Sequence, residues 1–406
     1  MLIFGVILFA LGITVSIALH EAGHMWTARA LGMKVRRYYI GFGPKIFSFR
    51  RGETEYGLKA IPAGGFCDIA GMTQHDELAP DEVDRAMYKQ KTWKRLVVMS
   101  GGIAMNFVLG IVLVFVLAMG VGMPNPETRA VVSGLVCVAP SQGPAPDYEL
   151  APCTGAGPAQ TAGIREGDVI VAVNGTATPE FSDVVKATQP LAGTAEYTVE
   201  RDGQRLVIPV PVTQAQRWVS KTGPDGKALP PVSKDVAAIG IAAPPRFVTY
   251  SAVDAVPEVA TFTGDIFARS VQGLVQMPGK VVDLWHSVTG GERGQDTPVS
   301  VVGASVIGGQ AAENSNWQVF VLLLATLNFF LGIFNLLPLL PLDGGHMAVA
   351  IYEKIRNVVR GRRGLPAGAP VDYAKLMPLT YVVIVIGGAY MLLTLTADIV
   401  NPIKIF

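Results

Sequence analysis

The 406-residue sequence has few charged residues and almost no imbalance between positive and negative charge. Only 16% of its residues are Asp, Glu, Lys or Arg, and the formal net charge is +1. The basic excess that accompanies nucleic-acid binding is therefore absent, and no nucleic-acid partner is expected. Three cysteines are too few for a disulfide-based scaffold. With a mean hydropathy of +0.39, this composition is typical of an integral membrane protein.

Four apolar segments are long enough to cross a bilayer, which takes about 20 residues of helix. The first segment lacks the basic start of a secretory signal, so we expect it to remain as a membrane span. The four spans are expected at about Leu2 to Ala30, Leu96 to Val121, Val319 to Leu337 and Leu379 to Val400.

Basic residues predict the orientation of these spans. Twelve Lys and Arg residues lie between Lys34 and Arg95, and six more lie between Lys354 and Lys375. Since basic loops stay in the cytoplasm, these two loops are expected inside, with the long middle segment and both termini outside. The predicted location is the plasma (inner) membrane, which the chain crosses four times.

The first span contains the sequence His20-Glu21-Ala22-Gly23-His24. Residues four apart share one face of a helix, so the two histidines can bind one metal ion beside Glu21. The alternative is a histidine pair that only makes hydrogen bonds inside a helix bundle. Ionisable groups within a span are costly and usually functional, which favours the metal site. His20 lies about 27 Å along the helix from Leu2, near the cytoplasmic face.

The third span is expected to run in the same direction as the first and to end in a second group of polar residues. Pro338 and Pro341 must interrupt the helix there, and Asp343 follows them. A catalytic zinc ion typically has three protein ligands, so Asp343 can supply the third one at the required depth. The alternative is an Asp-Gly turn at the membrane surface, formed by Asp343 and Gly344.

These two motifs resemble those of the site-2 protease family of intramembrane zinc metalloproteases. That family pairs a His-Glu-x-x-His span with a later Leu-Asp-Gly span, here His20 to His24 and Leu342 to Gly344. The layout, with one module of the PDZ type, is similar to the RseP-like branch and to its single-PDZ actinobacterial members. Further matches are Gly41-Phe42-Gly43-Pro44, Ile61-Pro62-Ala63-Gly64-Gly65-Phe66 and Asn335 through His346.

The resemblance implies specific roles for individual residues. It implies that His20, His24 and Asp343 bind one Zn²⁺ and that Glu21 is the general base. It also implies that Asn335 and Pro338 help to hold the substrate, whereas we expect Asn328 to be a packing contact between helices.

The resemblance also implies the class of substrate. In regulated intramembrane proteolysis the substrates would be single-span proteins already cut outside the membrane, such as anti-sigma factors, and remnant signal peptides. A membrane-anchored protease with a cytosolic catalytic domain is a second enzyme class, but the sequence has no such helical domain. A non-enzymatic scaffold that binds partners through its PDZ module would be expected to have lost Glu21 or a metal ligand, and all are intact.

The predicted fold class is an α-helical integral membrane protein with four transmembrane helices. A membrane-associated β-hairpin or sheet follows the first helix, and an extracytoplasmic PDZ-like α+β domain follows the second. The expected segments are 1–32 (span one with the metal motif), 33–95 (re-entrant β region and interfacial helix), 96–121 (span two), 122–215 (PDZ-like domain), 216–318 (linker and gating region), 319–345 (span three with the third ligand), 346–378 (cytoplasmic loop), 379–400 (span four) and 401–406 (extracytoplasmic tail).

Two of the soluble segments allow more than one interpretation. The strand-like residues after the first span, with a turn at Arg51-Gly52, are either an edge that pairs with unwound substrate or an ordinary hairpin. The residues from Asp81 to Arg95 are expected to form a helix on the inner leaflet or a solvated linker helix.

The PDZ-like module leaves two further questions open. It either binds a peptide at a strand edge or excludes large ectodomains from the site. Cys137 and Cys153 flank a Pro/Gly-rich insertion within it and lie on the oxidising side of the membrane. A disulfide between them is one of two equally weighted outcomes.

Overall fold

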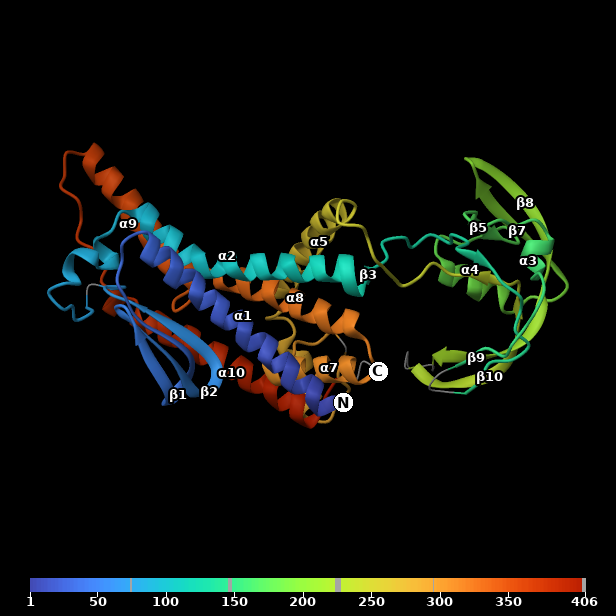
Figure 1. Ribbon diagram of the computed structural model, residues 1–406, viewed down its shortest axis with the longest axis horizontal. Coiled ribbons are helices and arrows are strands. Elements are labelled where there is room, and N and C mark those ends of the chain that lie inside the picture. Colours follow the sequence, from blue (N-terminus) through green and yellow to red (C-terminus); the bar gives the residue numbers. More distant parts are fainter. Residues whose placement is uncertain (74, 145–147, 223–227, 295, 404–406) are drawn as a thin grey trace. The chain divides into compact units, whose positions relative to one another are not determined.

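A computed structural model describes residues 1–73, 75–144, 148–222, 228–294 and 296–403 (Figure 1). The chain forms two compact units. One contains Met1–Met123 and Thr249–Phe406, and the other contains Pro124–Val248. The strands β3 (Met123–Pro124) and β12 (Phe247–Val248) lie where the chain passes from one unit to the other.

Among the described residues of the first unit, four helices are long and apolar enough to cross a membrane, as the sequence predicts. The second one continues into a turn of π-helix at Leu117–Val121. The helix bounds lie within a few residues of the expected ones. These helices are α1 (Leu2–Ala30), α2 (Thr92–Val116), α8 (Trp317–Asn335) and α10 (Met377–Val400).

Small residues and one buried amide hold α1 against its neighbours. A Cβ atom on Gly101 of α2 would lie 2.6 Å from the carbonyl oxygen of Gly23, so the two helices meet backbone to backbone. On α8, the amide of the fully buried Asn328 donates a hydrogen bond of 3.0 Å to Ser16 Oγ of α1. The expectation that Asn328 is a packing contact is confirmed.

The β region is a hairpin that folds back on itself. Strands β1 (Val35–Arg51) and β2 (Thr54–Ile69) are antiparallel, and the turn lies at Gly52 as expected. Residues 37–40 pair with 55–58 on one side, and residues 35–40 pair with 65–69 on the other, so that Tyr39 faces both Gly57 and Phe66. Residues 65–69 therefore form one edge of a sheet with four strand segments.

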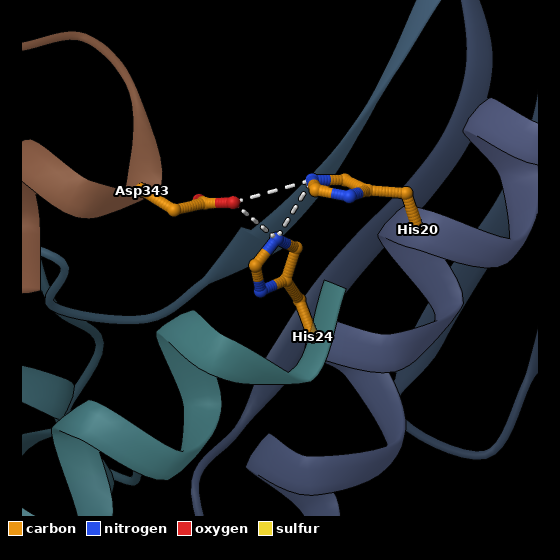
Figure 2. Close-up of side chains that lie close together, drawn as sticks. All are labelled: His20, His24 and Asp343. Carbon is orange, nitrogen blue, oxygen red and sulfur yellow. Dashed lines mark hydrogen bonds and ion pairs between the residues drawn. The ribbon is translucent and has the colours of Figure 1, made fainter. Parts of the chain in front are cut away.

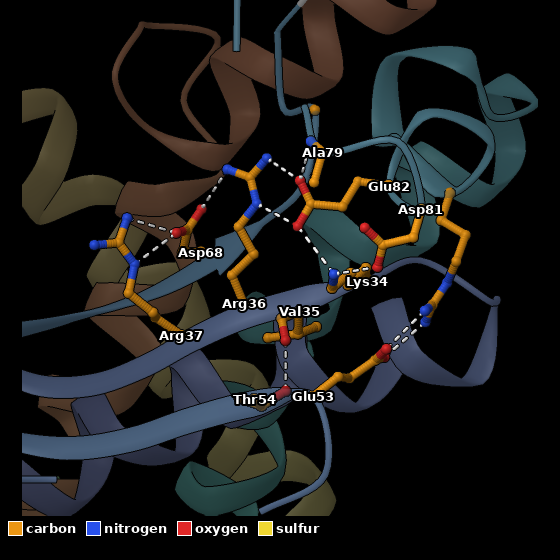
Figure 3. Close-up of polar contacts among 12 residues, drawn as sticks. Lys34, Val35, Arg36, Arg37, Glu53, Thr54, Asp68, Ala79, Asp81 and Glu82 are labelled. Atoms are coloured by element: carbon orange, nitrogen blue, oxygen red, sulfur yellow. Dashed lines mark hydrogen bonds and ion pairs between the residues drawn. The ribbon is translucent and has the colours of Figure 1, made fainter. Parts of the chain in front are cut away.

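The prediction of a helix from Asp81 to Arg95 is wrong. Within this stretch the chain forms two short 3₁₀ turns, Val83–Arg85 and Met87–Lys89, before α2 begins at Thr92. Tertiary contacts hold this stretch against the hairpin instead. Arg36 of β1 donates to Glu82 at 2.7 Å (Figure 3), and the backbone amide of Met87 donates to the Ala70 carbonyl at 2.9 Å.

The third span ends earlier than expected. Helix α8 stops at Asn335, before both prolines, and Asp343 is the first residue of a separate helix, α9 (Asp343–Arg362). Residues 346–378, expected to be a loop, contain most of α9 and a 3₁₀ turn at Tyr373–Lys375. A Cβ on Gly345 would lie 2.6 Å from the Leu340 amide nitrogen, so glycine allows α9 to pack tightly on the preceding loop.

In the part of the chain that the structure describes between Thr249 and the third span, where a linker was expected, there are three more helices. They are α5 (Ala255–Gln276), α6 (Val281–Val288) and α7 (Val301–Glu313). Beside them Arg293 and Asp398 form a buried ion pair at 2.6 Å, which ties the end of α10 to the segment before α7. Residues of α7 also pack against the start of α1: a Cβ on Gly309 would lie 3.0 Å from the Leu2 carbonyl.

The second unit is an α+β domain around one apolar core, in which Ile170, Tyr197 and Val199 are fully buried. It extends to Val248, beyond the expected end at residue 215. The hypothesis of a disulfide between Cys137 and Cys153 is confirmed, with Cα atoms 5.9 Å apart. Its elements are the sheet β6-β5-β7-β8 (Thr176–Ala177, Val169–Val173, Thr194–Arg201, Gln204–Pro211), the hairpin β9 (Thr213–Thr222) and β10 (Ala228–Ala238), the pair β4 (Gly134–Leu135) and β11 (Ile241–Ala242), and the helices α3 (Pro158–Thr161) and α4 (Phe181–Thr188).

Candidate metal centre

Three potential ligand atoms converge in the first unit, as Figure 2 shows. His20 and His24 project from one face of α1, and Asp343 projects toward them from the start of α9. The Nε2 atoms of the two histidines are 3.2 Å apart. Each of them lies 3.3 Å from Oδ2 of Asp343. The structure thus brings together the two histidines and the aspartate that the sequence singled out.

This triangle has the dimensions of one face of a zinc coordination tetrahedron. For edges of this length, the centre of a regular tetrahedron lies about 2.0 Å from each corner, which matches the usual zinc–nitrogen and zinc–oxygen distances. Oδ2 of Asp343 is buried and makes no hydrogen bond within the part of the chain that the structure describes. A buried carboxylate oxygen needs a partner, and a cation at the centre of that tetrahedron would provide one.

Groups on α2 orient both histidines. Nδ1 of His24 lies 2.8 Å from the Val98 carbonyl oxygen, to which it donates its proton. This fixes the tautomer in which Nε2 is free to bind a metal. Nδ1 of His20 lies 3.1 Å from the amide nitrogen of Asn106, whose Oδ1 is buried without a partner among the described residues. A half-turn of that amide lets Oδ1 accept the Nδ1 proton of His20.

A glycine on the same helix makes room for the imidazole rings. A Cβ atom on Gly102 would lie 2.9 Å from Nε2 of His20 and even closer to Nε2 of His24. Sequence reasoning missed both Gly102 and Asn106. The available signal was a single amide side chain in an otherwise apolar span, which is costly unless it has a partner.

The ligand atoms open into a cavity of about 300 Å³. Asn335 lines this cavity, as expected for a residue near the site, whereas Pro338 is not among the lining residues. The complete lining is His20, Glu21, His24, Gly65, Phe66, Cys67, Ile69, Met72, Met99, Asn335, Pro341, Leu342 and Asp343.

Glu21 lies in the same cavity, next to the edge of the hairpin sheet. The backbone amide of Cys67 interacts with its carboxylate. A Cβ on Gly65 would lie 3.1 Å from Cγ of Glu21, so residues 65–69 pass directly beside this side chain. The arrangement therefore places a carboxylate, a candidate metal site and a strand edge around one small space.

A buried ion pair fixes the helix that carries Asp343. Arg95 at the start of α2 donates to Glu353 of α9 at 2.5 Å, and about a tenth of each side chain is exposed. The other carboxylate oxygen of Glu353 accepts from the Val371 amide at 2.6 Å. In the same helix His346 stacks on Tyr373, and burial lowers the pKa of His346. Sequence reasoning also missed this ion pair between two helices that are far apart in the sequence.

Comparisons with known proteins agree over almost the whole chain. The family model described as peptidase family M50 matches residues 8–379. The chain is 51% identical to the zinc metalloproteases Rip1 of Mycobacterium bovis and of Mycobacterium tuberculosis, with 100% of each chain covered. It is 50% identical to the zinc metalloprotease Rip1 of Mycolicibacterium smegmatis, over 99% of this chain and 98% of the relative. These similarities include the second unit as well as the metal centre.

Proposed function

The chain belongs to peptidase family M50, the site-2 protease family, and is a zinc metalloprotease of the membrane; on this basis we propose that it hydrolyses peptide bonds inside the membrane-spanning segments of other proteins. One observation carries the proposal. The metal-binding histidines lie within an apolar helix long enough to cross a bilayer, and Asp343 meets them at the same depth. A bond cleaved at this centre must be brought to membrane depth.

His20, His24 and Asp343 are the proposed zinc ligands, and Glu21 is the proposed general base. When bound, zinc lowers the pKa of a coordinated water toward 7 and polarises the scissile carbonyl. Glu21 lies in the same cavity and accepts a proton from the attacking water. It then returns this proton to the leaving amine. Val98 and Asn106 hold the two imidazole rings in place while this occurs.

The edge of β2 at residues 65–69 is the proposed docking strand for substrate. A helical segment shields its peptide bonds with its own hydrogen bonds, so it must unwind before hydrolysis. An extended segment can be held by backbone hydrogen bonds to a strand edge, and this edge borders Glu21. Asn335 lines the cavity and is proposed to bind the substrate backbone. Pro338 is proposed to act indirectly, by shaping the loop between α8 and α9.

The proposed topology follows the distribution of Lys and Arg. In this topology both loops that are rich in basic residues lie on the cytoplasmic side of the plasma (inner) membrane. The site then opens near the cytoplasmic face, from which water reaches the cavity. The second unit, proposed to be an extracytoplasmic PDZ-like domain, either binds a peptide or excludes proteins with large ectodomains. The proposed substrates are therefore single-span proteins already trimmed outside, such as anti-sigma factors, and remnant signal peptides.

The test uses the full chain reconstituted in liposomes with a single-span substrate. Glu21→Gln removes the general base but keeps the three ligands, so cleavage should fall to background while zinc content stays near that of the wild type. Glu313→Gln is the matched control, since Glu313 is exposed at the end of α7 and should leave cleavage unchanged. Cleavage by the Glu21→Gln variant would overturn the assigned mechanism. A scaffold with no peptidase activity would show no cleavage with any of the three proteins.

A further inference from the structure

A second and larger cavity lies at the opposite end of α1 from its N-terminus, where the helix meets the turn of the hairpin. Its volume is about 730 Å³, and it shares no lining residue with the cavity at the metal centre. Its walls are formed by three arginines and three aromatic residues, together with Met25, Gly52 and Glu53. These six are Arg29, Arg51, Arg85, Trp26, Phe49 and Tyr56.

The charges in this cavity are not balanced. Glu53 is the one acidic residue in the lining, and Arg85 pairs with it through two hydrogen bonds of 2.7 Å. Neither Arg29 nor Arg51 has a carboxylate within 4.0 Å among the residues that the structure describes. Arg29 donates to Thr54 Oγ1 at 2.7 Å and lies over the ring of Tyr56. Two guanidinium groups thus retain free donors toward the cavity.

The position of the cavity places it at the surface of the bilayer. Helix α1 has 29 residues, or about 44 Å, which exceeds the hydrocarbon thickness of about 30 Å. Counted from Leu2, the helix crosses the hydrocarbon layer after about 20 residues, so its last turns, with Trp26 and Arg29, extend into the headgroup layer. Trp26 and Phe49 are each 51% exposed, and tryptophan is enriched at membrane interfaces. The aromatic residues can contact the upper acyl chains while the arginines face the headgroups.

From these observations we propose that this cavity binds the phosphate group of an anionic membrane lipid. Arginine presents planar, bidentate donors that fit phosphate oxygens. An anionic headgroup supplies the negative counter-charge that Arg29 and Arg51 lack. A bound lipid would connect the end of α1 to the hairpin turn. These are the two elements that border the active site. The inference depends on the membrane position of α1 and not on the proposed peptidase substrate.

The experiment measures lipid retention by the full chain in nanodiscs that contain equal parts of phosphatidylcholine and phosphatidylglycerol. After the protein is released from the nanodiscs, native mass spectrometry should find the wild type bound mainly to phosphatidylglycerol. Arg51→Gln should reduce the fraction that retains this lipid about fivefold, the effect of roughly one basic residue at a membrane surface. Arg51→Lys keeps the positive charge and should restore most of the lipid retention.

The neighbouring Arg50 provides the matched control. It is exposed on the same strand but does not line the cavity, so Arg50→Gln should retain the lipid as the wild type does. Equal retention in the Arg50→Gln and Arg51→Gln proteins would overturn the proposal. Zinc content near one per chain in each variant verifies that the first unit is folded.

A second arm distinguishes a lipid from a soluble phosphate compound. Inorganic phosphate at 10 mM should leave the retained phosphatidylglycerol unchanged, since the aromatic contacts to acyl chains add to the binding of a lipid. Displacement of the lipid by inorganic phosphate would overturn the assignment to a membrane lipid and assign the cavity to a soluble phosphate ester.

Discussion

The carboxylate oxygen Oδ2 of Asp343 lies 3.3 Å from Nε2 of His20, although these residues belong to the last third and the first tenth of the chain. The helices α1 and α9 must therefore be positioned relative to each other precisely enough to bring these two atoms within 3.3 Å. The contacts that hold them are the backbone approach of α1 to α2 at Gly23 and Gly101, and the ion pair between α2 and α9.

Removing the carboxylate should remove the metal. Asp343→Ala leaves only two protein ligands, fewer than the three that catalytic zinc sites use. The zinc content of the purified protein, measured by elemental mass spectrometry, should fall from about one per chain to a small fraction. Asp372→Ala is the control, since Asp372 is a partly exposed carboxylate outside the cavity. Unchanged zinc in the Asp343→Ala protein would exclude Asp343 from the ligand set.

Asn106 should affect zinc binding without touching the ion. Its amide lies 3.1 Å from Nδ1 of His20 and orients the ring. Loss of such a partner typically weakens metal affinity or activity 10- to 100-fold, so we expect that range for Asn106→Ala in a competition titration with a chelator. Ser100→Ala on the same helix removes only a hydrogen bond to Val97 and should keep wild-type affinity. Equal affinities for all three proteins would contradict a role for Asn106 in orienting His20.

The ion pair between Arg95 and Glu353 should matter most when only one partner is removed. Glu353→Gln leaves a buried guanidinium without its counter-charge, which costs about 3–5 kcal/mol in comparable buried pairs. The variant should unfold at a clearly lower temperature. The double variant Arg95→Met/Glu353→Leu removes both charges and should recover much of that loss. A Glu353→Gln protein as stable as the wild type would show that the pair does not hold α9 in place.

The contact between the hairpin and the segment before α2 should weaken in acid. Hydrogen bonds from Arg36 hold the pKa of Glu82 at about 2, below the ordinary value of 4.5 (Figure 3). Because the pKa is lowered by folding, Glu82 contributes stability above pH 4.5 and loses this contribution as the pH falls toward 2. The protection factors of the backbone amides in residues 83–89, which divide out the intrinsic pH dependence of hydrogen exchange, should fall over this range.

The matched variant for this pH dependence is Glu82→Gln, which has no carboxylate to titrate at this position. Its protection factors in residues 83–89 should already be lower at pH 7 and should change less between pH 4.5 and 2. A wild type with the same protection factors at both ends of that range would contradict the assigned contact.

The sequence predicted the parts of the fold that depend on local composition and spacing. The four long helices follow from their length and hydropathy. The His20–His24 pair follows from the helical repeat, and the proximity of Asp343 follows from the parallel direction of two spans. None of these inferences required knowledge of which side chains meet across the fold.

The parts that the sequence did not predict depend on such tertiary contacts. The stretch from Asp81 to Arg95 has a helical pattern, but Glu82 and Arg85 are paired with the hairpin and the backbone bonds to Ala70. Asn106 is a lone amide in an apolar span and could equally have been a packing residue such as Asn328. The start of a new helix at Asp343 depends on the tight packing of Gly345 against its own loop.

The central claim, hydrolysis of a bond at membrane depth, is tested most directly by mapping the cleaved bond. A single-span substrate is reconstituted with the full chain in liposomes, and both product termini are sequenced by mass spectrometry. The account predicts that the wild type cuts inside the apolar segment and that Glu21→Gln yields neither terminus. A cut confined to residues outside the apolar segment would contradict it.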